Sequence, residues 1–94
     1  MDMPQVARCQ VRECAYNSSG ACHALAITVG DENTAKCDTF FAIPQKGGDP
    51  QAVGRVGACK VTACLYNDML ECQAASITVD MPNGEADCMT FREE

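Results

Sequence analysis

Two stretches of the chain decide its fold, because they repeat one another. Residues 9–29 read CQVRECAYNSSGACHALAITV, and residues 59–79 read CKVTACLYNDMLECQAASITV, with 10 identities in 21 ungapped positions. One inserted residue later, Cys37, Thr39 and Phe40 align with Cys88, Thr90 and Phe91. The chain therefore carries one unit of roughly 35 residues twice, as internal repeats do.

Each repeat has four cysteines, spaced Cys-x4-Cys-x7-Cys-x14-Cys in the first and with x15 in the last interval of the second. The extra residue falls in a turn sequence that contains Asn-Gly, a strong hairpin signal. We predict a hairpin in each repeat, with strands at 26–29 and 35–41 in the first and at 76–80 and 85–91 in the second. The segment 9–22 predicts loop and turn.

These features divide the chain into a first repeat (1–41), a linker (42–56) and a second repeat (57–94). The linker is rich in Pro and Gly, and Asp49 followed by Pro50 could cap a short helix there. Whether the two repeats pack against each other is open at this level.

The composition leaves little material for an apolar core. Only 16 of the 94 residues are Leu, Ile, Val or Phe, which is too few to offset the entropy of ordering the chain. The eight cysteines are the remaining source of stability. We therefore expect a small, metal-stabilised, β-poor and irregular fold of two tandem four-cysteine units.

Metal ligation explains the cysteines better than disulfides do. The start of the chain, Met1-Asp2-Met3-Pro4-Gln5, has no basic and apolar pattern of a secretory signal, so we expect a reducing, cytoplasmic setting. Four thiolates complete the tetrahedral shell of zinc. We predict two Zn²⁺ ions, one per repeat, held by Cys9, Cys14, Cys22, Cys37 and by Cys59, Cys64, Cys72, Cys88. Exchange of ligands between repeats and iron in place of zinc stay open.

The other soft or titratable side chains are weaker candidates. His23 aligns with Gln73, which cannot replace it as a ligand, so we expect a solvated histidine. Met69, Met81 and Met89 have no methionine counterparts in the first repeat, which favours surface or gap-filling positions over a copper site. The aligned aromatic residues should pack around each metal.

Charge and motifs exclude several functions. The net charge is −6 and the basic residues are scattered, so we expect no binding to nucleic acid or to an anionic membrane. Four thiolates leave no open coordination position for a catalytic water, and the chain has no nucleophile motif or phosphate-binding loop. We therefore expect no enzyme activity.

The complete pattern resembles a bacterial family of short four-cysteine proteins known as domain of unknown function 1540. The resemblance rests on Cys9-x-Val11-x2-Cys14-x-Tyr16-Asn17, Cys22-x-Ala24-x2-Ile27-Thr28-Val29 and Cys37-x-Thr39-Phe40, and on the second set from Cys59 to Phe91. It implies a small cytoplasmic bacterial protein whose cysteines are zinc ligands, and it supplies no biochemical activity.

Our leading expectation is a non-enzymatic interaction module, stabilised by two zinc ions, with an unknown protein partner and an unknown oligomeric state. A zinc storage, trafficking or thiol-redox sensing protein is the alternative, and an exported disulfide scaffold is a third.

Overall fold

The strands that the sequence predicts most directly are formed by the Ile-Thr-Val segments. In the computed structural model, which describes residues 3–30, 34–82 and 84–93, they are β4 (Ile27–Val29) and β8 (Ser76–Asp80). The isoleucine and valine of each are buried and the threonine between them is half-buried. This alternation is that of a strand with one face in the core.

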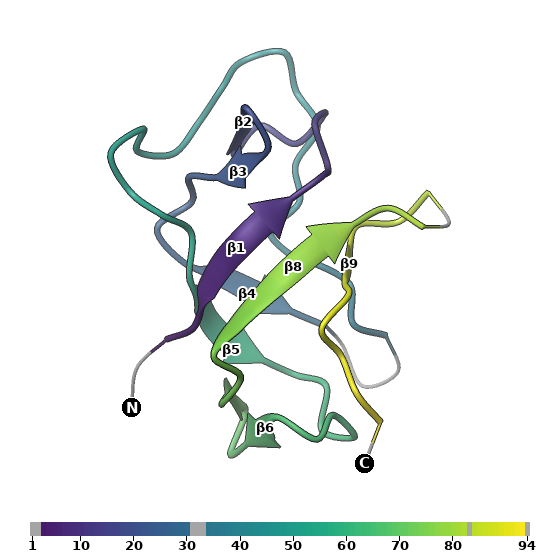
Figure 1. Ribbon diagram of the computed structural model, residues 1–94. Helices are drawn as coiled ribbons and strands as arrows, with labels where there is room; N and C mark the ends of the chain where they lie inside the picture. The colour runs from purple at the N-terminus through teal and green to yellow at the C-terminus, as the bar shows by residue number, and fades with distance from the viewer. Residues whose placement is uncertain (1–2, 31–33, 83, 94) are drawn as a thin grey trace.

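Each of these strands pairs with a strand from the other repeat. β1 (Gln5–Cys9) runs parallel to β8, and β5 (Val56–Cys59) runs parallel to β4 (Figure 1). The register places Val6 opposite Ile77 and Val56 opposite Ile27. The repeats are therefore intertwined, and β1 and β5, which precede the first cysteine of each repeat, are strands that the sequence analysis did not predict.

The two parallel pairs are related by an internal two-fold axis. The isolated bridges Gln5–Arg55 and Lys36–Asp87 each join a residue to its own counterpart in the other repeat, as contacts on a two-fold axis do. Backbone bonds beside the axis match as well: Val6 N donates to Gly54 O (2.8 Å) and Val56 N to Pro4 O (2.9 Å).

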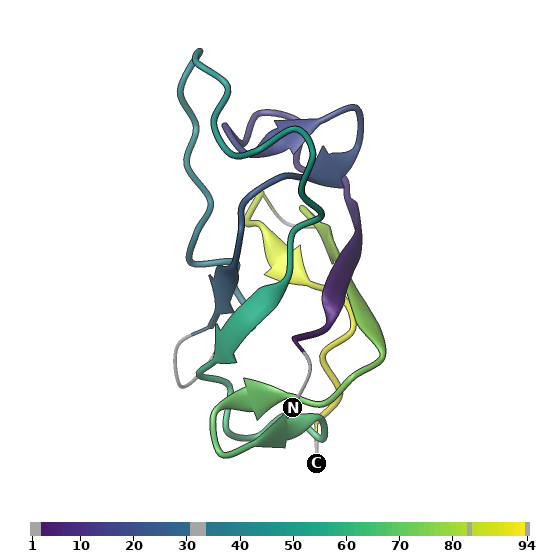
Figure 2. The same cartoon turned by 90° about the vertical axis from the view of Figure 1, so that its left-hand side faces the viewer.

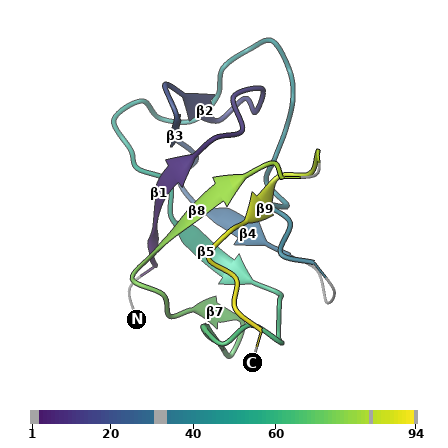
Figure 3. The same cartoon turned by 45° about the vertical axis from the view of Figure 1, so that its right-hand side comes forward.

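Both predicted hairpins are present. β8 turns back antiparallel into β9 (Asp87–Cys88) (Figure 3). In the first repeat, Val29 forms an antiparallel bridge with Cys37. The returning segments then pair with each other across the axis, where Cys37 N donates to Ala86 O and Cys88 N to Ala35 O, both at 2.7 Å. Of the predicted turns, residues 31–33 and 83 lie outside the described residues.

The segment 9–22, predicted as loop and turn, also holds a small hairpin, so that prediction was incomplete. Its strands are β2 (Asn17–Ser18) and β3 (Ala21–Cys22), and the second repeat repeats them as β6 (Asn67–Asp68) and β7 (Glu71–Cys72). Two-residue strands are too short to show a periodic pattern in the sequence. The two small hairpins lie at opposite ends of the molecule (Figure 1).

The linker forms no helix, which corrects the expectation of a short one. Asp49 makes a single turn instead: its Oδ1 accepts from Gln51 N and its carbonyl oxygen from Ala52 N, both at 2.9 Å. The chain then runs extended into β5, whose first residue, Val56, lies inside the range assigned to the linker. The described residues contain no helix long and apolar enough to cross a membrane.

One core serves both repeats. It joins the buried valines and isoleucines of the four paired strands to the cysteines of both repeats, and Tyr16, Tyr66, Phe40 and Phe91 pack against it, half-buried. The radius of gyration is 12.1 Å, the size of a single domain of this length. The fold is thus the expected small irregular one of short strands.

Candidate metal centres

The four cysteines of the first repeat meet around one small cavity. Cys9 ends β1, Cys22 ends β3, Cys14 lies in a bend between them, and Cys37 forms the bridge with Val29 of β4. All four line a cavity of about 20 Å³, enough for one water-sized occupant. Its walls are apolar and come from both repeats: Tyr16 and Phe40 from the first, Val79 and Ala86 from the second.

The second repeat groups its own cysteines in the same way. The thiols close enough to raise the pKa of Cys72, after burial itself, are Cys59 and Cys64. The thiols close enough to raise the pKa of Cys88, after burial, are Cys72 and Cys59. Each thiol cluster is therefore drawn from one repeat, although its walls include residues of the other.

The side chains do not stand in a finished coordination geometry. Within residues 3–30, 34–82 and 84–93, no group of three or more Cys, His, Asp or Glu side chains is already arranged to hold a metal ion. All eight cysteines are free of disulfide bonds, and all are buried except Cys88, which is half-buried.

Backbone amides point at the sulfur atoms in a repeated pattern. The amide two residues on donates to the thiol of Cys22 (from Ala24) and of Cys37 (from Thr39). The second repeat has the same two bonds, from Ala74 to Cys72 and from Thr90 to Cys88, with a further bond from Phe91 to Cys88. Such donors favour the thiolate over the thiol, which is the form that binds a metal.

Burial acts in the opposite direction and dominates. Desolvation raises the pKa of Cys22 and Cys72, and raises that of Cys37 and Cys88 to about 11. The amide bonds lower these values and the neighbouring thiols raise them further. Without a cation, these four groups therefore carry their protons at neutral pH.

Two pairs of residues position the clusters, and the sequence analysis missed both. Asn17 is buried and donates to Cys9 O (2.8 Å), as Asn67 does to Cys59 O (2.8 Å). Thr39 Oγ1 accepts from Thr28 N (3.1 Å), a bond that Thr90 and Thr78 repeat at 3.0 Å. Their identity in the two repeats was the available signal, which was interpreted only as evidence of duplication.

The histidine is not solvated as expected. His23 is half-buried, and its Nδ1 donates to Ala52 O in the linker at 2.9 Å. It does not line the cavity. The methionines do occupy surface or packing positions, with Met69 and Met89 exposed and Met81 packed against the core.

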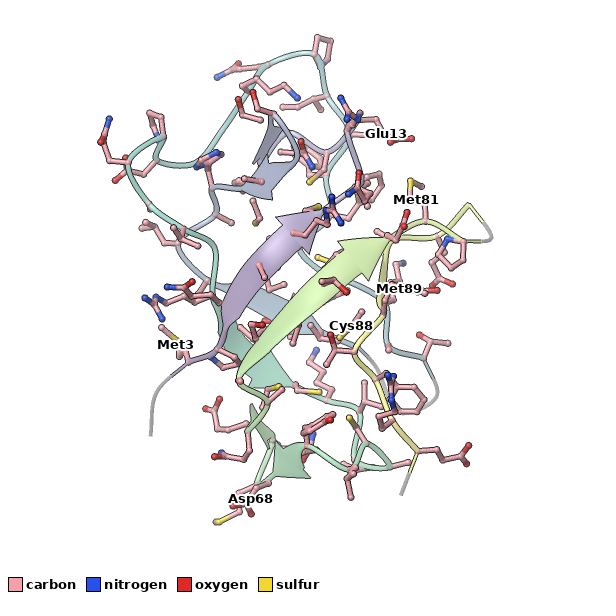
Figure 4. The ribbon with its side chains drawn as sticks, viewed as in Figure 1. Met3, Glu13, Asp68, Met81, Cys88 and Met89 are labelled. Carbon is pink, nitrogen blue, oxygen red and sulfur yellow. The ribbon has the colours of Figure 1, made fainter. Side chains whose placement is uncertain are left out.

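The two clusters differ in their access to solvent. Cys37 is 8% exposed, whereas its counterpart Cys88 is half-buried and lines an open hollow of about 330 Å³ with Ala35, Pro82, Met89 and Phe91. Figure 4 places Cys88 beside Met89, on the side of the molecule where β9 runs.

Comparison with known protein families finds a match to each of the two repeats. The model of the family "Domain of Unknown Function (DUF1540)" matches twice, at residues 7–40 and 58–91. No curated protein and no solved structure matches the chain. The two family matches begin inside β1 and β5, and each ends three residues after the fourth cysteine of its repeat. The chain is therefore a tandem, two-copy member of the DUF1540 family.

Proposed function

We propose that this chain is a non-enzymatic, cytoplasmic protein that binds two zinc ions, one in each four-cysteine cluster, and uses them to stabilise a surface that binds another protein. The observation that carries the proposal is the cavity that Cys9, Cys14, Cys22 and Cys37 share. Four thiolates around a site of that size match the ligand set of structural zinc.

The core supports the same conclusion. Eight thiols occupy positions where larger apolar side chains would otherwise fill the interior. Ligation of a structural zinc contributes on the order of 10 kcal/mol at neutral pH, and a chain of this size with so few aliphatic residues needs such a contribution. The amides directed at four of the sulfur atoms would stabilise the thiolates of the metal-bound form.

Cobalt(II) titration under anaerobic, reducing conditions tests the proposal. Tetrahedral thiolate sites should give intense charge-transfer absorption that saturates at two equivalents and is abolished by zinc. Cys14→Ser and Cys64→Ser should each reduce the stoichiometry to one. The control His23→Gln should leave it at two, because the second repeat carries glutamine there. Saturation at one equivalent, or no absorption in the wild-type chain, would refute the two-site assignment.

A zinc-releasing or redox-sensing role is the second candidate, favoured by the half-buried Cys88 on its open hollow. Exposed thiolates are the ones that oxidants reach. If this role is correct, mild peroxide should release one equivalent of zinc, and Cys88 should be the first cysteine modified. Release of both ions at equal rates would contradict it.

A further inference from the structure

The linker covers one face of the first repeat. Its amides donate to three carbonyl groups of that face: Gly47 N to Ala15 O (2.8 Å), Asp49 N to His23 O (2.9 Å) and Gly54 N to Cys22 O (2.8 Å). Figure 2 shows this teal segment passing over β2 and β3 before it descends into β5. We call residues 45–54 the strap.

Within the part of the chain that the structure describes, no segment is bonded over the matching face of the second repeat as the strap is over the first. This face consists of Leu65, Tyr66, Cys72, Gln73 and Ala74, which lie 50 residues after their counterparts, and we call it the bare face. Leu65 is 59% exposed whereas its counterpart Ala15 is 3% exposed. Ala74 is half-buried and Gln73 exposed, where Ala24 is buried and His23 half-buried.

Two carbonyl groups of the bare face lack the backbone donors that the strap supplies to their counterparts in the first repeat. No backbone amide of the described residues donates to the carbonyl group of Leu65 or Gln73. Pro4 occupies the place of Gly54 in the internal symmetry, and proline has no N–H to offer the carbonyl of Cys72. An open hollow of about 440 Å³ borders Gln73 and Ala74, between Met3, Pro4 and Arg55.

We propose that the bare face binds an extended segment of a partner protein, along the path that the strap takes over the first repeat. The first repeat supplies the template: the same fold, with the same carbonyl groups, already holds such a segment. Addition of an extended chain through main-chain hydrogen bonds is a recurrent mode of peptide recognition. This inference names the surface for the interaction part of the proposed function, and it does not depend on the identity of the metal.

The strap defines the chemistry of that partner segment. Gly48 has a positive φ of 86°, and a Cβ atom there would collide with the carbonyl of His23, so the segment needs glycine at this step. Lys46 Nζ lies 3.4 Å from the carbonyl oxygens of Arg12 and Cys14. A basic residue in the partner would meet the equivalent carbonyls, in a chain of net charge −6.

A second copy of this chain is the poorer occupant. Its strap is engaged by its own first repeat, and two chains of charge −6 repel each other. The bare face offers an apolar side chain, Leu65, where the first repeat has alanine. The partner segment should therefore add an apolar contact that the strap does not make.

The probe is a synthetic peptide of residues 42–54, AIPQKGGDPQAVG, blocked at both ends. It is titrated to millimolar concentration into the ¹⁵N-labelled, metal-loaded full chain. We expect amide shifts at Leu65, Tyr66, Gln73 and Ala74, and none at Ala15 or Ala24, which the strap already covers. A peptide in which the glycines at positions 47 and 48 are replaced by valine should bind at least about tenfold more weakly.

Two exposed leucines give matched protein variants. Leu65→Asp should weaken the peptide at least about tenfold, whereas Leu25→Asp, 69% exposed on the first repeat, should leave the affinity unchanged. Absence of shifts at millimolar peptide, or equal effects of the two variants, would overturn the proposal. The metal content of the same sample is measured separately, so failure of zinc binding and failure of peptide docking are distinguishable.

Discussion

Cys9 lies directly opposite Val79 in the parallel pair of β1 and β8, so the first cysteine of one repeat is held in register by the central strand of the other. The reciprocal pair is Cys59 opposite Val29. Parallel strands need a long connection between them, and here residues 10–75 connect β1 to β8 and residues 30–55 connect β4 to β5. Neither repeat contains the parallel partner of its own Ile-Thr-Val strand.

This intertwining predicts that a single repeat cannot fold as a monomer. A fragment of residues 1–41 with saturating zinc should be either largely unfolded or a symmetric dimer, in which a second copy supplies the missing strands. Light scattering and amide dispersion in NMR spectra distinguish these states. A folded monomer of the fragment would show that the pairing between repeats is dispensable.

The paired asparagines predict unequal losses of stability. Asn17→Ala removes the bond to Cys9 O and leaves that carbonyl buried without a partner, which should cost about 1–3 kcal/mol in the free energy of unfolding. Asn67→Ala breaks the equivalent bond at a half-buried site and should cost less. Denaturant unfolding of the metal-loaded variants measures both, and equal losses would be evidence against the stronger burial of Asn17.

The turns of the two small hairpins allow the cost of backbone strain to be compared at equivalent positions. Gly20 (φ 80°) in the first repeat corresponds to Leu70 (φ 68°) in the second, and a left-handed conformation costs a residue with a side chain roughly 1–2 kcal/mol. Leu70→Gly should therefore stabilise the chain by about 0.5–1 kcal/mol, since glycine also loses more entropy on folding.

The reverse change, Gly20→Leu, has open space around it and should destabilise by a similar amount through strain alone. Thermal unfolding of both variants tests the pair. Destabilisation by Leu70→Gly would mean that the leucine makes a compensating contact.

Metal affinity should depend steeply on pH. The raised pKa values of Cys22 and Cys37, and of Cys72 and Cys88, mean that each incoming ion displaces at least two protons at neutral pH. With two protons displaced, affinity should rise roughly 100-fold per pH unit and level off above the pKa of about 11 of Cys37 and Cys88. Competition titrations with a chelator at pH 6, 7 and 8 measure this, and a flat profile would contradict it.

The same raised pKa values determine whether the metal-free fold gains or loses stability as the pH rises. A thiol whose pKa is higher in the folded than in the unfolded state stabilises the fold while it is protonated, and this contribution is lost as the pH rises through the folded pKa. Any residual metal-free fold should therefore weaken between pH 9 and about 11.

Local features of the fold could be predicted from the sequence, and long-range pairing could not. Ile27-Thr28-Val29 and its copy carry an alternating pattern, and both hairpins were predicted correctly from them. The partners of these strands lie far away in the chain, because Val6 meets Ile77 and Val56 meets Ile27. β1 and β5 are too short to carry a periodic signal, so their pairing with the other repeat could not be predicted from the sequence.

The grouping of the cysteines by repeat could be predicted from the sequence, whereas the surroundings of the clusters could not, and the assignment of the cysteines as metal ligands stays a prediction. The spacing of the cysteines was sufficient to group them by repeat, in agreement with the cavity around Cys9, Cys14, Cys22 and Cys37. The roles of Asn17 and Thr39 depend on where their side chains meet backbone atoms 8 and 11 residues away. The contact between His23 and Ala52 arises only because the linker crosses back over the first repeat.

The most direct test of the central claim is native mass spectrometry of the chain purified under reducing conditions, with the denatured mass measured alongside. The account predicts two bound zinc ions in the native spectrum and a fully reduced polypeptide after denaturation. A metal-free native species, lighter than the reduced chain by the hydrogens of four disulfide bonds, would contradict it.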